Sequence, residues 1–153
     1  MLFVTTIYRM LGASTQNGAT GSQLPRTLGQ QLFFEPSVFS YFSPQYRIAG
    51  SGLLGPEFQI DGPAAAVARA NLATSLVMGY RDKSTAFDFS PYLGAGDSAT
   101  LIGLLNQNML HGAMSSALQE SLAGLLSNSA PGLPQVKDAI ALVTASPEFS
   151  VQK

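Results

Sequence analysis

The feature that most constrains the fold is an apolar, aromatic-rich segment without a regular period. Seven of the chain's fourteen aromatic residues lie between Phe33 and Phe58, and three prolines interrupt the same stretch. Apolar residues there keep neither helical nor strand spacing, and each proline removes a backbone donor. Such a loop would gain nothing from its aromatic side chains unless they were covered. We therefore expect an irregular segment, over about residues 24–60, that is buried against a small-residue helix.

Other stretches place apolar residues at helical spacing between capping and breaking residues. Pro63 follows an Asp-Gly pair and opens an alanine-rich run, Asp97 or Ser98 can cap a later helix, and Ser116 has capping-box spacing with Gln119. The expected helices cover about residues 2–12, 63–80, 98–110, 116–127 and 134–145. The sequence thus predicts one mainly α unit over residues 1–153, with four or five helices and no substantial β-sheet.

Composition excludes several classes of function. Charged residues make up 11% of the chain, against about 25% in ordinary soluble domains. The net charge is −1 without a basic run, so the chain lacks the electrostatic signature of a nucleic-acid binder. Zero cysteines exclude disulfides and thiolate catalysis, and we predict no metal or cofactor. The low charge favours a surface that lies against more protein, either another protein or a second copy of this chain.

The start of the chain predicts neither a signal peptide nor a membrane anchor. It reads LFVTTIYRMLGA, without a positively charged leader or a small-residue cleavage site. Its apolar run is far shorter than the roughly 20 residues of a membrane-spanning helix. No residue before Leu2 can cap the first expected helix.

Several short motifs occur along the chain. They are Leu28-Gly29-Gln30, Pro36-Ser37-Val38-Phe39, Tyr46-Arg47, Gly50-Ser51-Gly52-Leu53-Leu54, Pro56-Glu57-Phe58, His111-Gly112, Met114-Ser115 and Ala145-Ser146-Pro147-Glu148-Phe149. Together they resemble the C-terminal portion of the bacterial "domain of unknown function 1800" family. The chain departs from that pattern at Glu35 and Ser40, where the family pattern has proline and glycine.

The resemblance has implications for location and partners. Members of that family are longer, largely helical and commonly exported, and their biochemical activity is not established. The resemblance implies that Met1 is an internal methionine of a larger chain, whose N-terminal portion is a partner of this unit. It also implies that the parent protein is exported to the periplasm or beyond the cell, although no signal peptide occurs here.

One arrangement of residues could carry out hydrolysis. His111 is the only histidine, Ser115 lies four residues later, and Asp97 precedes both. A serine, a histidine and an acid can act as nucleophile, base and orienting group on an ester or a lactone. The alternative is that His111 simply ends a helix, where its ring meets the last carbonyl groups. The chain lacks a Gly-x-Ser-x-Gly motif.

The aromatic segment supplies candidate ligand-binding residues. Tyr41, Phe42 and Tyr46 could stack on sugar rings in a carbohydrate-binding module, or they could be core residues. Arg47 could pair with Glu57, or it could offer its guanidinium to an anionic ligand.

Two further sets of carboxylates are candidates for chemistry. Glu57 and Glu148 each stand in a Pro-Glu-Phe triplet and could form an acid and base pair, although a carboxylate near a helix start more commonly binds backbone donors. Asp82, Asp88 and Asp97 match no calcium-loop spacing. The sequence favours a non-catalytic helical scaffold or interaction part, with a small ester or lactone hydrolase and a carbohydrate-binding module as alternatives. It does not decide whether the protein is an enzyme.

Overall fold

A computed structural model describes residues 2–16, 24–30, 33–80 and 83–150. The described chain is mainly helical with one small two-stranded sheet, which confirms the predicted fold class. In chain order the elements are α1 (Leu2–Met10), β1 (Ser14–Thr15), the 3-10 helices η1 (Leu24–Leu28) and η2 (Pro56–Gln59), α3 (Pro63–Val77), β2 (Thr85–Ala86), α4 (Ser90–Leu93), α5 (Ser98–Leu110), α6 (Ser116–Asn128), α7 (Leu133–Ala145) and α8 (Pro147–Ser150).

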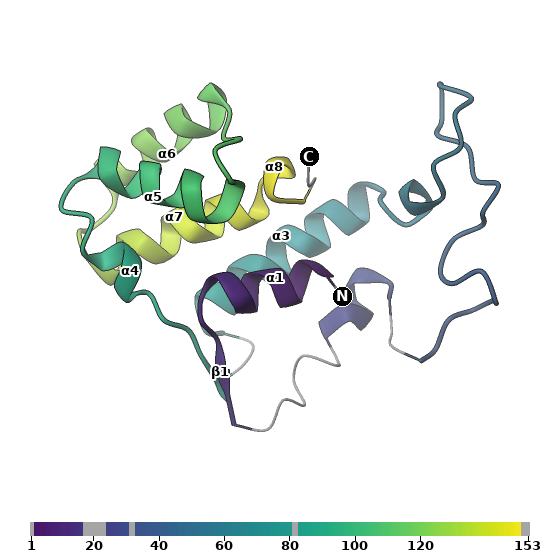
Figure 1. Ribbon diagram of the computed structural model, residues 1–153, viewed down its shortest axis with the longest axis horizontal. Helices are drawn as coiled ribbons and strands as arrows, with labels where there is room; N and C mark the ends of the chain where they lie inside the picture. Colours follow the sequence, from purple (N-terminus) through teal and green to yellow (C-terminus); the bar gives the residue numbers. More distant parts are fainter. Residues whose placement is uncertain (1, 17–23, 31–32, 81–82, 151–153) are drawn as a thin grey trace.

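Helix α7 is the centre of the helical body. It contacts α3, α4, α5, α6 and α8, and in Figure 1 it runs between α3 and the α5–α6 pair. Val136, Ala139, Ile140 and Val143 are buried on it at i, i+3, i+4 and i+7, which is one face of a helix. The body is therefore held by apolar packing around a single helix.

Helix α1 packs beside α3 and joins the body at two further points. Val4 lies in a buried cluster with Leu72 and Leu76 of α3. The ring of Phe3 meets Phe149 of α8 edge to face, with centroids 5.7 Å apart. After α1, strand β1 pairs antiparallel with β2, which fixes the chain that leads into α4.

Caps explain where the helices begin and end. The Asp97 side chain accepts a hydrogen bond from the Thr100 backbone N–H and opens α5, as predicted. Ser115, rather than Ser116, caps α6 by accepting from the Leu118 N–H, so the predicted capping box with Gln119 is wrong. The first helix and the alanine-rich helix end earlier than predicted, at Met10 and Val77, before turns in the left-handed region at Gly12 and Gly79.

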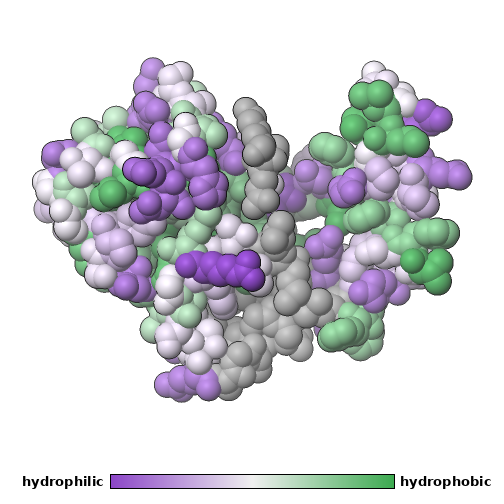
Figure 2. All heavy atoms as spheres, in the orientation of Figure 1, coloured by the Kyte–Doolittle hydropathy of each residue, from purple (hydrophilic) through white to green (hydrophobic). Residues whose placement is uncertain are grey.

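Residues 33–61 form an arm that projects from the helical body (Figure 1). Its backbone pairs with itself: the Ile48 N–H donates to the Leu53 carbonyl (2.9 Å), and the Gly55 N–H donates to the Tyr46 carbonyl (3.0 Å). Its exposed large apolar residues are Phe33, Phe34, Val38, Phe39, Leu53, Leu54 and Phe58. Figure 2 shows hydrophobic patches along the outer edge of this arm, at the right.

The predicted burial of the aromatic segment against α3 is therefore wrong. The surface of α3 that is covered contacts α7, α1 and η1, so only the beginning of the predicted 24–60 segment, residues 24–28, packs on α3. Ala64, Ala66 and Val67, in the first turns of α3, stay exposed, so the arm does not cover them. Local turns bond several of the arm's backbone donors without a helical support beneath the arm.

The described helices include none with the length and apolar character needed to cross a membrane.

Candidate functional site

The residues predicted to act in hydrolysis are not brought together. Asp97 caps the N-terminus of α5 and His111 caps its C-terminus, and the helix between them has 13 residues. At about 1.5 Å per residue, the two caps are separated by roughly 20 Å along the helix axis. Asp97 is therefore too far from His111 to orient its ring, and these three residues do not form a triad.

Ser115 and His111 both have structural contacts that explain their positions. The Ser115 hydroxyl accepts from the Leu118 N–H (3.2 Å) and also bonds to the Glu148 carboxylate. His111 is exposed and adopts a left-handed backbone conformation (φ 53°), while the N–H of Gly112 returns to the Asn106 carbonyl (3.0 Å). This matches the alternative in which His111 ends a helix.

The Asp97 carboxylate makes the stability of the fold depend on pH. Hydrogen bonds from the backbone and then the hydroxyl of Thr100 hold the pKa of Asp97 below its ordinary value of 3.8. A lowered pKa in the folded state stabilises the fold above pH 3.8, and this stability is lost as the pH falls through the folded pKa. In urea titrations we expect Asp97→Asn to be less stable than the parent near neutral pH. The difference in free energy of unfolding should shrink as the pH falls below 3.8 and through the folded pKa of Asp97. A difference independent of pH would contradict this role.

Glu57, Glu148 and Arg47 also lie apart from their predicted partners. Glu148 accepts from the Ser115 N–H (3.2 Å) at the start of α6, whereas Glu57 belongs to η2 at the root of the arm. The Arg47 guanidinium donates to the Gly52 carbonyl (2.6 Å) in its own turn. The predicted Arg47–Glu57 pair is therefore wrong, and the loop itself accepts one hydrogen bond from the arginine.

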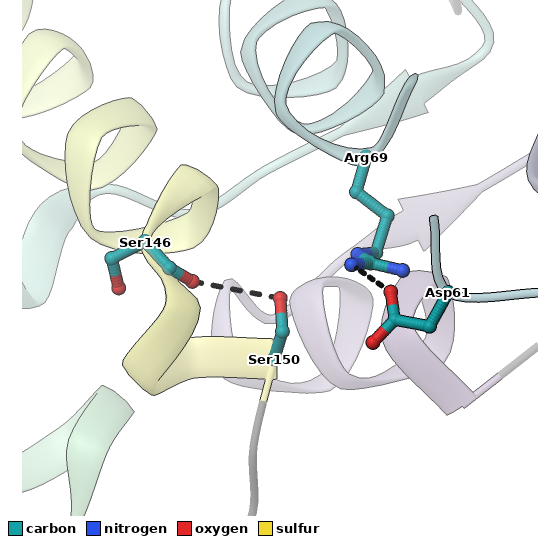
Figure 3. Close-up of polar contacts among 4 residues, drawn as sticks. All are labelled: Asp61, Arg69, Ser146 and Ser150. Atoms are coloured by element: carbon teal, nitrogen blue, oxygen red, sulfur yellow. Dashed lines mark hydrogen bonds and ion pairs between the residues drawn. The ribbon is translucent and has the colours of Figure 1, made fainter. Parts of the chain in front are cut away.

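A cavity of about 410 Å³ lies where the root of the arm meets the body. Its polar walls include an ion pair between Arg69 of α3 and Asp61 (Figure 3). Ser150 of α8 also lines it and donates to the Ser146 carbonyl (3.5 Å). Sequence reasoning missed the pair, although an acid just before Pro63 and an arginine two turns into the helix are compatible with it. The pair ties the end of the arm to α3.

A second hollow, of about 420 Å³, lies within the arm and is called the arm pocket below. Tyr41 and Phe42 line it, as their predicted binding role requires, whereas Tyr46 does not. Its lining residues are Pro36, Ser37, Phe39, Ser40, Tyr41, Phe42, Ser43, Pro44, Gln45 and Gln59. Of the predicted ligand-binding residues, Tyr41 and Phe42 therefore share the arm pocket, and Glu57 lines the first cavity instead.

The described part of the chain shows no cluster of metal-ligating side chains. Its His, Asp and Glu side chains form no group of three that could hold a metal ion. Asp82, one of the three aspartates compared above with calcium-loop spacing, lies outside the described residues.

Comparisons with known proteins add no template for either hollow. No protein-family model matches the chain, and neither a curated protein nor a solved structure matches it. The resemblance to the "domain of unknown function 1800" family therefore stays an expectation drawn from the motifs.

Proposed function

We propose that this chain is a helical interaction module whose arm docks into an apolar groove of a protein partner. The observation that carries the proposal is the exposure of large apolar side chains along the arm. Phe33 is 89% exposed and Val38 is 94% exposed. Exposed apolar patches mark interaction sites in soluble proteins.

The arm has features that suit a protein surface as its partner. Covering each exposed phenylalanine or leucine is worth about 1.5–3 kcal/mol of transfer free energy. Few charges oppose desolvation, because the arm carries only Glu35, Arg47, Glu57 and Asp61 among its residues. Local backbone bonds already order its turns, which lowers the entropic cost of docking.

The partner proposed from the resemblance is the larger N-terminal portion of an exported parent protein. In that arrangement the helical body is a scaffold and the arm reaches the neighbouring domain. The module needs no catalytic residues for this role, in keeping with the separation of Asp97 from His111 along α5.

Self-association offers a direct test of the arm, because an uncovered apolar surface should find other copies of itself. We expect the apparent mass measured by light scattering to rise with concentration. The double variant Phe34→Glu and Phe39→Glu should remain monomeric, since it introduces charge into the apolar surface.

Leu133→Glu provides a matched control, because Leu133 is 42% exposed but lies on α7, away from the arm. This variant should associate like the parent. A parent chain that stays monomeric at high concentration and binds no hydrophobic dye would overturn the proposal, as would an equal effect of Leu133→Glu.

A further inference from the structure

Among the described residues, no charged side chain lines the arm pocket. Its polar walls are three serines and two glutamines, and its apolar walls are two prolines and three aromatic rings. A volume of about 420 Å³ lies within the range of about 300–1,000 Å³ typical of small-ligand sites. The walls therefore offer ring faces and neutral hydrogen-bonding groups and provide no ionic contact.

Tyr41 lines this pocket, but its hydroxyl is shielded from solvent, so a ligand in the hollow cannot bond to it. Among the described residues the hydroxyl oxygen has no hydrogen-bond partner. Desolvation and then the charge of Glu35 raise the pKa of Tyr41, so the hydroxyl keeps its proton at neutral pH. The nearby Glu35 carboxylate disfavours an anionic ligand.

Hydrogen bonds hold the pocket walls in place. Ser40 has a left-handed backbone (φ 73°), and its N–H donates to the Ser37 carbonyl (3.1 Å). The Gln59 side chain accepts from the Ser43 N–H (2.6 Å), which joins the two sides of the arm. The pocket is therefore formed before any ligand arrives.

We propose that the arm pocket binds a short stretch of a neutral saccharide. A sugar ring presents an apolar face that can lie on the rings of Tyr41 and Phe42. Its hydroxyls match the serine and glutamine side chains, which can donate hydrogen bonds to them and accept hydrogen bonds from them. The site shares Phe39 with the protein-docking surface proposed above, but the other exposed residues of that surface do not line the pocket.

Calorimetric titration with soluble neutral hexasaccharides tests the site. The probes are β-1,4-linked glucose, β-1,4-linked xylose and α-1,4-linked glucose hexamers, together with a uronic-acid hexamer as the anionic comparison. We expect saturable binding of at least one neutral probe and no tighter binding of the anionic one. Phe42→Leu should weaken that binding, because it removes a stacking ring while keeping an apolar side chain.

Tyr41→Leu and Tyr46→Leu form a matched pair, because each removes one aromatic ring and only Tyr41 lines the pocket. Tyr41→Leu should weaken binding by about two- to tenfold, the value of one aromatic contact. Tyr46→Leu should leave it unchanged.

Three results would overturn this site: absence of saturable binding by every neutral probe, tighter binding of the uronic-acid hexamer, or equal weakening by the two tyrosine variants. Light scattering of the parent chain is independent of all three. A monomeric chain that binds a neutral hexamer would refute the docking arm and keep the saccharide site.

Discussion

Replacement of Ile140 by alanine is expected to lower the free energy of unfolding by about 2–5 kcal/mol. Ile140 is fully buried in the middle of α7, the helix that contacts most of the others. The loss of its side-chain atoms leaves a cavity, and the tightly packed helices around it cannot move enough to fill that cavity. Urea unfolding followed by circular dichroism measures the change, with an unchanged slope showing that the same surface unfolds.

Leu133→Ala is the matched control for Ile140→Ala, because it removes a branched aliphatic side chain from the same helix at a partly exposed position. We expect a loss well below that of Ile140→Ala. Similar losses for the two variants would show that α7 is not the packing centre of the body.

Ser115→Ala is expected to lower the free energy of unfolding by about 1–2 kcal/mol. The change removes the N-cap of α6 and the bond from the Ser115 hydroxyl to Glu148 of α8. A double-mutant cycle with Glu148→Gln should show coupling, because the two side chains share that bond. Thermal and urea unfolding of the four proteins in the cycle provide the measurement.

The neighbouring serine supplies the control for the cap. Ser116 has the capping-box spacing in the sequence but lies in the first turn of α6 and is exposed. Ser116→Ala should change stability by less than about 0.5 kcal/mol, as for ordinary surface substitutions. A larger loss for Ser116→Ala than for Ser115→Ala would return the cap to the position that the capping-box pattern predicts.

Local signals explain why the helices could be predicted from the sequence. Asp97 as a cap, Pro63 at a first helical position and apolar residues at helical spacing act within a few residues of one another. The one-residue error at Ser115 has a different origin. Glu148, far along the chain, bonds to that serine and adds to its role as the cap, and no local pattern contains this contact.

The arm shows the limit of reading burial from composition. Aromatic content indicates that a surface gains free energy by being covered, but it does not say what covers it. The turns of the arm bond to themselves, and Arg47 donates to the Gly52 carbonyl five residues away. Nothing in the folded body then pulls the segment onto α3.

The candidate site could be predicted only in part for a related reason. Side-chain direction in an irregular loop follows no period, so spacing could not separate Tyr41 and Phe42 from Tyr46. The proposed triad could have been excluded from the sequence itself. A helix predicted over residues 98–110 already places Asp97 and His111 at opposite ends.

The position of α7 in the chain has a consequence for biosynthesis. The helices α1, α3, α5 and α6 all leave the ribosome before α7, yet the core packs around α7. Until residues 133–145 emerge, the nascent polypeptide carries apolar helix faces that have no native cover. During translation the growing chain therefore presents binding sites for chaperones, and these sites close when α7 packs.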